Sequence, residues 1–180
     1  MSGIFVNRGM MKLEERAKAQ IEDLEVSVSW YTGQNMQNRD FRKFVEVIYR
    51  NFEEIAEVTV LRHNRTEIKK IMTSPTALIL VATLSDRIIG YLIADLVLYN
   101  DRSLMHVYYL FTSPGYRNKG VATFLLNQVQ DYAEVYNCSA LSLTFDTYND
   151  QLNKYYTSNG FTFDPELRSE QRYDMMVKFI

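Results

Sequence analysis

LFTSPGYRNKGVA, residues 110–122, joins the apolar pattern of a strand to the amphipathic pattern of a helix. A chain that turns at Gly120 and then begins a helix leaves several backbone N–H groups without partners. Those groups point into the positive end of the helix dipole, where an anion such as a pyrophosphate is stabilised. The segment therefore predicts a phosphate-binding loop.

Two well-known phosphate loops do not fit this segment. Gly115 and Gly120 have the glycine spacing of Gly-x-x-x-x-Gly-Lys-Ser/Thr, but Val121 and Ala122 stand where that loop needs its lysine and hydroxyl. The dinucleotide fingerprint Gly-x-Gly-x-x-Gly is absent from the sequence. The motif that remains is Arg-x-x-Gly-x-Ala at residues 117–122.

This motif resembles the Gln/Arg-x-x-Gly-x-Gly/Ala loop of the Gcn5-related N-acetyltransferases, the GNAT superfamily. The preceding Leu-Phe-Thr-Ser-Pro-Gly-Tyr is similar to that family's strand end and proline. Asn118 stands where many members have glycine, a departure that a loop acting through its backbone tolerates. The resemblance implies that acetyl-CoA is the cosubstrate and that its pyrophosphate is held by Arg117, Asn118, Lys119, Gly120, Val121, Ala122 and Thr123.

The composition narrows the class of protein. A chain of 180 residues is the size of one domain with its own core. The single cysteine, Cys138, excludes an internal disulfide and a cysteine-based metal site, and we expect it to be a small buried side chain. A net charge of −2 disfavours a nucleic-acid partner, and no apolar run predicts a membrane span or signal peptide. We expect a cytoplasmic protein that needs no metal; a homodimer is left open.

Near the N-terminus, Leu13, Ala17, Ile21 and Leu24 recur at helical spacing. They predict an N-terminal helical extension over residues 1–25, before a GNAT domain at 26–180. Later patterns predict helices at 38–55, 66–72, 121–136 and 150–159, and strands at 26–31, 77–83, 88–98, 104–112, 140–146, 161–163 and 173–179.

This order of elements is similar to that of the GNAT fold. The resemblance covers residues 26–180 and implies a mixed α/β (α+β) fold with a central sheet of about seven strands and about four flanking helices. Gly90 and the ending Asn159-Gly160-Phe161 are further points of similarity. In the family, the fourth and fifth strands separate and coenzyme A enters between them. Here those strands are 104–112 and 140–146, and the backbone of Leu110, Phe111 and Thr112 would pair with the pantetheine arm.

Two residues near the last predicted helix correspond to functional positions in the family. Asn149 falls where many members bind pantetheine, and Tyr156 falls on the general-acid tyrosine. A phenol suits this role because its reference pKa of about 10 lies above the thiol value of about 8.5. The alternatives are that Asn149 only caps the helix and that Tyr156, with Leu152 and Tyr155, only packs in the core.

The acceptor amine must lose a proton before it can attack, and histidine titrates closest to neutral pH. His106 corresponds to the glutamate that histone-acetylating members use as a base, although it could equally be a half-buried structural side chain or act beside an ordered water. Strand alternation would place His106, Tyr108 and Leu110 on one face. No comparable argument applies to His63.

The resemblance thus implies an N-acetyltransferase, an acyltransferase that moves acetyl directly to a primary amine on a small molecule or a peptide. Trp30, Tyr31, Glu53, Glu54 and Glu57 fall where the family forms its acceptor side, although the glutamates could simply be a solvated helix end. Two alternatives remain at this stage: a coenzyme-A-binding module without catalysis, and an interaction protein without a ligand.

Overall fold

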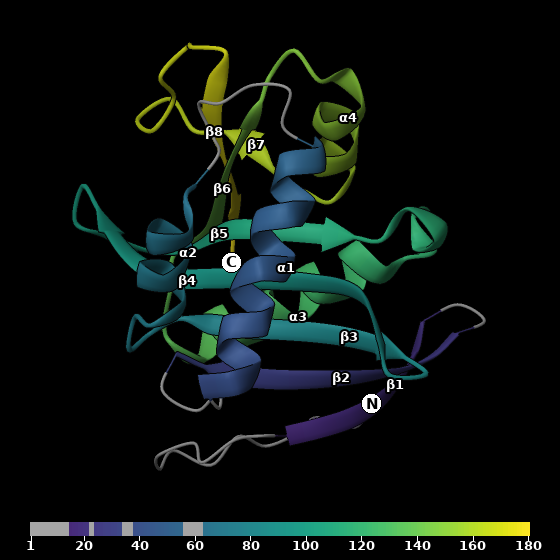
Figure 1. Ribbon diagram of the computed structural model, residues 1–180. Helices are drawn as coiled ribbons and strands as arrows, with labels where there is room; N and C mark the ends of the chain where they lie inside the picture. The colour runs from purple at the N-terminus through teal and green to yellow at the C-terminus, as the bar shows by residue number, and fades with distance from the viewer. Residues whose placement is uncertain (1–14, 22–23, 34–37, 56–62) are drawn as a thin grey trace.

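The sheet at the centre of the fold is built from every strand in the described part of the chain. The computed structural model describes residues 15–21, 24–33, 38–55 and 63–180. The strands are β1 (Glu15–Ile21), β2 (Leu24–Thr32), β3 (Leu78–Leu84), β4 (Arg87–Tyr99), β5 (Arg102–Thr112), β6 (Ala140–Asp146), β7 (Thr162–Phe163) and β8 (Tyr173–Phe179). They lie in the order β1-β2-β3-β4-β5-β6-β8-β7 (Figure 1). All neighbours are antiparallel except β5 and β6, which are parallel.

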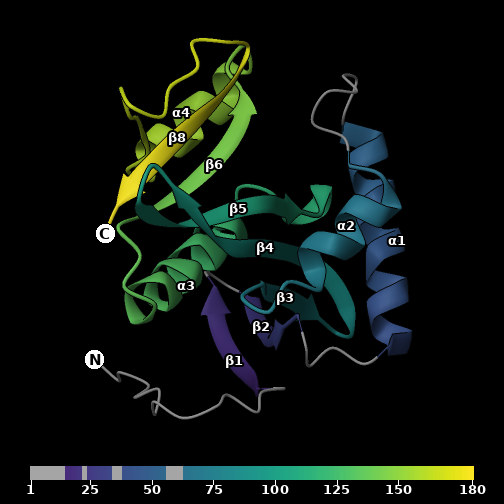
Figure 2. The same ribbon diagram turned by 90° about the vertical axis from the view of Figure 1, so that its left-hand side faces the viewer.

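Four helices cover the two faces of the sheet. They are α1 (Asn38–Ile55), α2 (Arg65–Met72), α3 (Val121–Val135) and α4 (Asp150–Ser158). Helices α1 and α2 lie on one face, and α3 and α4 lie on the other (Figure 2). None of the helices in these described ranges is long and apolar enough to cross a membrane. The predicted mixed α/β fold is confirmed, and the helix starting at Asn38 has the bounds that the sequence predicts.

The prediction of an N-terminal helix is wrong for the part of it that the structure describes. Residues 15–21 form β1, which pairs with β2 so that Ala17 lies opposite Val28 and Ala19 opposite Val26. The error has a simple cause, because a spacing of four residues, as between Ala17 and Ile21, keeps one face of a helix and also one face of a strand. The sheet therefore has eight strands rather than about seven; Leu13 lies outside the described residues.

Each face of the sheet has its own core. On the side of α1 and α2 the buried residues are Phe44, Val45, Ile48, Ile68, Met72, Ile79, Val81, Tyr91, Ile93 and Tyr109. The larger cluster on the other side includes Leu80, Leu92, Val107, Leu125, Val129, Leu141, Leu143 and Phe145. Cys138 is buried within this cluster, as expected of a small apolar side chain. Successive strand residues thus alternate between the two cores.

Gly90 determines how closely α3 approaches the sheet. A Cβ atom at this position would lie 2.8 Å from Val121 Cγ1 and 3.0 Å from the carbonyl oxygen of Phe111. Both distances are shorter than an ordinary van der Waals contact. The glycine therefore allows Val121, in the first turn of α3, to pack directly against β4 beside the end of β5.

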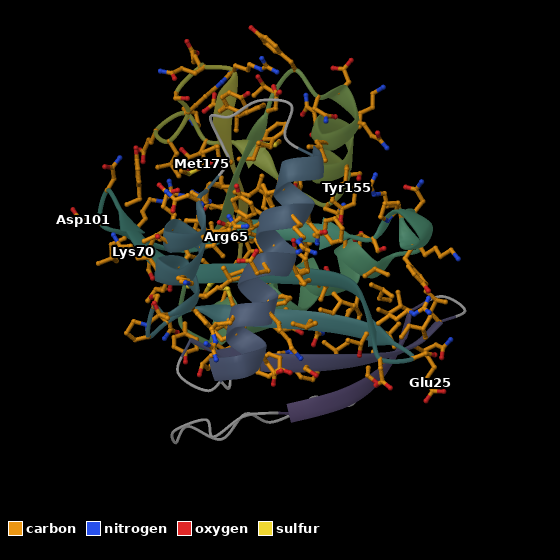
Figure 3. All side chains as sticks on the ribbon, in the orientation of Figure 1. Glu25, Arg65, Lys70, Asp101, Tyr155 and Met175 are labelled. Carbon is orange, nitrogen blue, oxygen red and sulfur yellow. The ribbon has the colours of Figure 1, made fainter. Side chains whose placement is uncertain are left out.

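The start of α2 is fixed by a capping box. The side chain of Asn64 accepts hydrogen bonds from the backbone N–H groups of Thr66 and Glu67, and the Glu67 carboxylate accepts one from Asn64 N at 2.7 Å. Arg65 also donates to Glu46 of α1 at 2.7 and 3.0 Å, and Figure 3 shows Arg65 between the two helices. The capping box fixes the first turn of α2, and the bonds from Arg65 to Glu46 hold that turn against α1.

Candidate active site

The strands β5 and β6 pair over only part of their length. The parallel register runs from Leu104 opposite Ala140 to Val107 opposite Leu143. Beyond Val107, β5 continues beside β4 as far as Thr112, while β6 continues beside β8, away from β5 (Figure 1). The predicted separation is confirmed. It leaves one edge of the β5 backbone, at residues 108–112, without a strand partner among the described strands.

The predicted phosphate loop begins directly after the separated end of β5. Asn118 and Gly120 both have positive φ angles, 59° and 75°. Asparagine is one of the few residues besides glycine that adopts this conformation readily, which explains why it can stand at position 118. Among the described residues no side chain caps the N-terminus of α3. Its first N–H groups are therefore free to bind an anion.

The Arg117 side chain connects this loop to the end of β5. Its Nε donates to the carbonyl oxygen of Thr112 at 3.2 Å, which joins the loop to the last residue of β5. Lys119 Nζ lies 5.8 Å from the centre of the Tyr116 ring. Both side chains are exposed, so their charges face solvent beside the uncapped helix end. Together they add positive charge where the helix dipole is already positive.

Two buried hydroxyl groups lie at the open end of the separated strands. Within the described ranges, Thr112 Oγ1 and Tyr173 Oη are the buried side-chain polar atoms without a hydrogen-bond partner. Thr112 ends β5, and Tyr173 begins β8 opposite Asp146, the last residue of β6. A buried hydroxyl left unpaired costs about 1–3 kcal/mol. A polar ligand between the strands is one way in which that cost would be recovered.

Tyr156 lies on the α3 and α4 side of the separated strands. Its ring packs edge-on against Phe145 of β6 at 5.6 Å and against Phe161 at 5.8 Å. Burial raises the pKa of the phenol well above its usual range. The neighbouring Tyr155 hydroxyl lies 3.3 Å from Thr123 Oγ1 and so joins α4 to the first turn of α3. Tyr156 is thus a packing residue. It lies beside β6, one of the two strands between which the ligand is expected to enter.

Asn149 is the N-cap of α4. Its side-chain oxygen accepts a hydrogen bond from Leu152 N at 3.0 Å, and the residue is exposed. The capping role is therefore confirmed. Gly160 follows the same helix with a φ angle of 86°, the left-handed conformation in which glycine commonly ends a helix.

His106 lies on the opposite face of the sheet, toward α1 and α2. Its Nδ1 is 3.0 Å from Ser142 Oγ, and its ring meets the Tyr108 ring edge-on at 4.7 Å. Burial, with a smaller contribution from the nearby His63, lowers the pKa of His106 to about 4. The imidazole is therefore neutral across the physiological pH range.

A β-bulge at Tyr108 changes the alternation of β5. Ile93 lies opposite Tyr109, whereas Ala94 lies opposite Val107, so Tyr108 is the extra residue. Tyr108 and Tyr109 consequently both face α1 and α2, and Leu110 faces α3. The prediction that His106, Tyr108 and Leu110 share one face is wrong for Leu110, because a bulge shifts every following side chain to the other face.

His63 is a site residue for which the sequence gives no argument. Its Nδ1 lies 2.6 Å from Tyr109 Oη, and its ring centre lies 5.6 Å from that of Tyr109 and 6.4 Å from that of Tyr108. Burial lowers the pKa of His63, while the Glu67 carboxylate acts in the opposite direction. The imidazole comes from the segment just before α2, so only tertiary packing brings it to β5.

A comparison with models of protein families shows which family the chain belongs to. The family model described as "Acetyltransferase (GNAT) family" matches residues 38–161, which include both the separated strands and the phosphate loop. The chain belongs to the GNAT acetyltransferase family. A comparison with curated protein sequences finds no match.

Solved structures with the GNAT fold resemble the whole described domain. NAA60 from Arabidopsis thaliana in complex with acetyl-CoA has a TM-score of 0.63 at 17% identity, over 85% of this chain and 98% of that one. PaiA N-acetyltransferase from Thermoplasma acidophilum in complex with coenzyme A gives 0.65 at 13% identity, over 87% and 100%. An aminoglycoside acetyltransferase from an uncultured soil metagenomic sample, in complex with sisomicin, gives 0.60 at 15% identity, over 81% and 93%. At such identities the likeness establishes the fold alone.

In this GNAT chain, one wall of the open end is held by charged contacts. Arg172 donates to both carboxylate oxygens of Asp146, at 2.7 to 3.1 Å, and so ties the segment before β8 to the end of β6. Asp174 accepts from the backbone N–H groups of Ser169 and Glu170 at 2.7 and 2.9 Å. These contacts give the segment between β7 and β8 a defined shape.

The residues predicted for the acceptor side lie in different parts of the structure. Trp30 lies within β2 rather than after it and packs in the core on the α3 side, so its assignment to the acceptor side is wrong. Tyr31 packs against the core beneath α1 and α2. Glu57 and the side chains of Glu53 and Glu54 lie outside the described residues.

Proposed function

We propose that the protein transfers acetyl from acetyl-CoA directly to a primary amine. One observation carries this proposal: β5 separates from β6 at the point where an uncapped helix N-terminus follows. The free edge of β5 suits the amides of a pantetheine arm, and the helix end suits a pyrophosphate. The expected contacts come from Leu110, Phe111 and Thr112, from residues 117–123 and from Asn149.

Asn149 can bind a ligand while it caps α4. The cap uses its side-chain oxygen. The amide nitrogen of the same exposed side chain is then available as a donor to a pantetheine carbonyl. The cap would serve to hold the carboxamide in one orientation for that contact.

Tyr156 is the proposed general acid. Acetyl transfer expels a thiolate, which must be protonated, and the reference pKa of a thiol is about 8.5. Burial raises the pKa of Tyr156 above the ordinary tyrosine value. The phenol consequently keeps its proton until a thiolate forms beside it.

The proton of the acceptor amine requires a base on the other face of the sheet. His106, or a water molecule beside it, is the group proposed from the sequence. Because the pKa of His106 is about 4 and its Nδ1 contacts the buried Ser142, it holds a proton poorly near neutral pH. His106 is therefore a poor match for the base itself.

The acceptor is a primary amine of a small molecule or a peptide. A small amine acceptor is supported by the aminoglycoside acetyltransferase, which was solved with sisomicin, and NAA60 was solved with a bisubstrate analogue. The described residues on the acceptor face are largely aromatic: Tyr108, Tyr109, His63 and His106. An amine that carries apolar groups next to its nitrogen would pack well against them.

The test has two stages. Isothermal titration calorimetry with acetyl-CoA measures donor binding, and an assay for free thiol over a panel of diamines, amino sugars and peptides measures transfer. We expect binding and amine-dependent thiol release. Binding without release on any amine would instead indicate a coenzyme-A-binding module, and an absence of binding would contradict the donor site itself.

A further inference from the structure

His63 is held at the acceptor face from two sides. Next to it in sequence, the capping box of Asn64 and Glu67 fixes the start of α2. At its side chain, Tyr109 Oη lies 2.6 Å from His63 Nδ1. Tyr109 is in turn fixed, because its ring meets the Phe52 ring of α1 edge-on at 4.8 Å and only 1% of the residue is exposed. A side chain held in this way has few rotamers to lose when a substrate binds.

The two histidines of the chain differ in their surroundings. Both are partly exposed, and each uses Nδ1 for its contact, His106 with the fully buried Ser142 and His63 with Tyr109. His106 is a residue of β5 surrounded by more of the protein, whereas His63 comes from the segment before α2. Among the described residues no hydrogen bond engages the second nitrogen of His63, Nε2, so this is the nitrogen that can meet a ligand. Tyr108, the bulge residue where β5 leaves β6, lies next to both rings.

We propose that His63 is the base that takes the proton from the acceptor amine, and that Tyr109 positions its imidazole. This role rests on the proposed acetyl transfer. In the tautomer required, Nδ1–H donates to Tyr109 Oη and Nε2 carries the lone pair. Among the described residues, the charged or titratable groups that face His63 are Glu67 from α2 and Tyr108, Tyr109 and His106 from β5.

The proton balance of the reaction is complete with these groups. An incoming ammonium gives one proton to His63 Nε2, and the neutral amine then attacks the thioester carbonyl. The C–N bond forms, the C–S bond breaks, and Tyr156 protonates the thiolate. The tyrosinate recovers a proton from the nitrogen of the new amide, and His63 releases its own proton to solvent. Overall the acetyl group moves from the thiol to the amine, the thiol gains one proton, and one proton is released to solvent, so no further reactant is needed.

The pKa of His63 supports this assignment over His106. Both values are lowered, but Glu67 opposes the shift at His63, and no carboxylate in the described part of the chain does so at His106. A base works best when its pKa lies near the working pH. His63 is therefore the better matched of the two.

His63→Gln and Glu67→Gln form the central test. His63→Gln should lower kcat/KM for the amine by roughly 100-fold, with acetyl-CoA affinity unchanged. Glu67→Gln keeps an acceptor for Asn64 N–H in the capping box but removes the charge that raises the pKa of His63. It should move the acidic limb of the kcat/KM profile to lower pH. Tyr109→Phe keeps the packing against Phe52 and should give a smaller loss, mainly in kcat.

Asn64→Ala is the matched control, because it loosens the capped segment next to His63 without removing the Glu67 charge that raises the pKa of the imidazole. It should lower Tm without moving the pH profile. If His63→Gln is folded and retains kcat/KM within about twofold of the parent, or if Glu67→Gln leaves the acidic limb in place, the assignment of His63 is wrong while acetyl transfer stands. If the parent protein binds acetyl-CoA and acetylates no amine, the proposed function fails, and the role of His63 fails with it.

Discussion

The proposed donor side and the proposed acceptor side of this protein are specified in different ways. Apart from Asn149, the donor side is one continuous segment, in which the end of β5, the loop and the start of α3 follow one another in sequence. The acceptor face is assembled from separate parts: His63 before α2, Tyr109 of β5, Phe52 of α1 and Ser142 of β6. A local motif can reveal the first kind of site, but only packing reveals the second.

We expect the largest fall in kcat from a substitution of Tyr156, the proposed general acid. Tyr156→Phe keeps the ring contacts with Phe145 and Phe161 and removes only the hydroxyl. We expect kcat to fall by roughly 100-fold to 10,000-fold, as for loss of a general acid, with Tm and acetyl-CoA affinity close to those of the parent. Steady-state kinetics and calorimetry measure the three quantities. A folded variant with near-parental turnover would remove Tyr156 from the mechanism and leave it as a core residue.

The second effect is a loss of free energy of unfolding in acid, caused by the protonation of His106. His106 has a pKa of about 4 when folded against a usual value of 6.5, so the unfolded chain binds more protons between these two pH values. Stability is therefore lost as pH falls through this window, by about 3 kcal/mol in total. Urea unfolding at several pH values measures the loss. His106→Gln, which can still bond to Ser142, should lose markedly less; equal losses would show that His106 does not titrate in this way.

The same division explains how far the sequence could predict the structure. The turn at Gly120 between β5 and α3 depends on neighbours in sequence, and it lies where the sequence predicts it. The strand β1 was missed because a four-residue spacing fits a helix and a strand equally. The face of Leu110 was missed because nothing local marks the bulge at Tyr108. His63 was missed because its partner Tyr109 is distant in sequence.

A third, smaller effect isolates the donor loop. Gly120 has a φ angle of 75°, and a side chain there costs about 1–2 kcal/mol. Gly120→Ala should therefore weaken acetyl-CoA binding about tenfold while KM for the amine stays near the parental value. Gly115→Ala is the matched control in the same loop, since a Cβ there would meet no atom within 4 Å. Equal affinities for the two variants would contradict the importance of the loop conformation.

The smallest effect separates capping from ligand binding at Asn149. Asn149→Asp keeps an oxygen that can cap α4 through Leu152 N, and a carboxylate also suits a helix N-terminus, so Tm should not fall. The variant lacks the amide donor proposed for pantetheine, and one hydrogen bond contributes about 1 kcal/mol. Acetyl-CoA binding should accordingly weaken about fivefold. Asn149→Ala should show the same weakening together with a lower Tm. Unchanged affinity in Asn149→Asp would mean that the asparagine serves the helix alone, and that the donor contacts end with β5 and the phosphate loop.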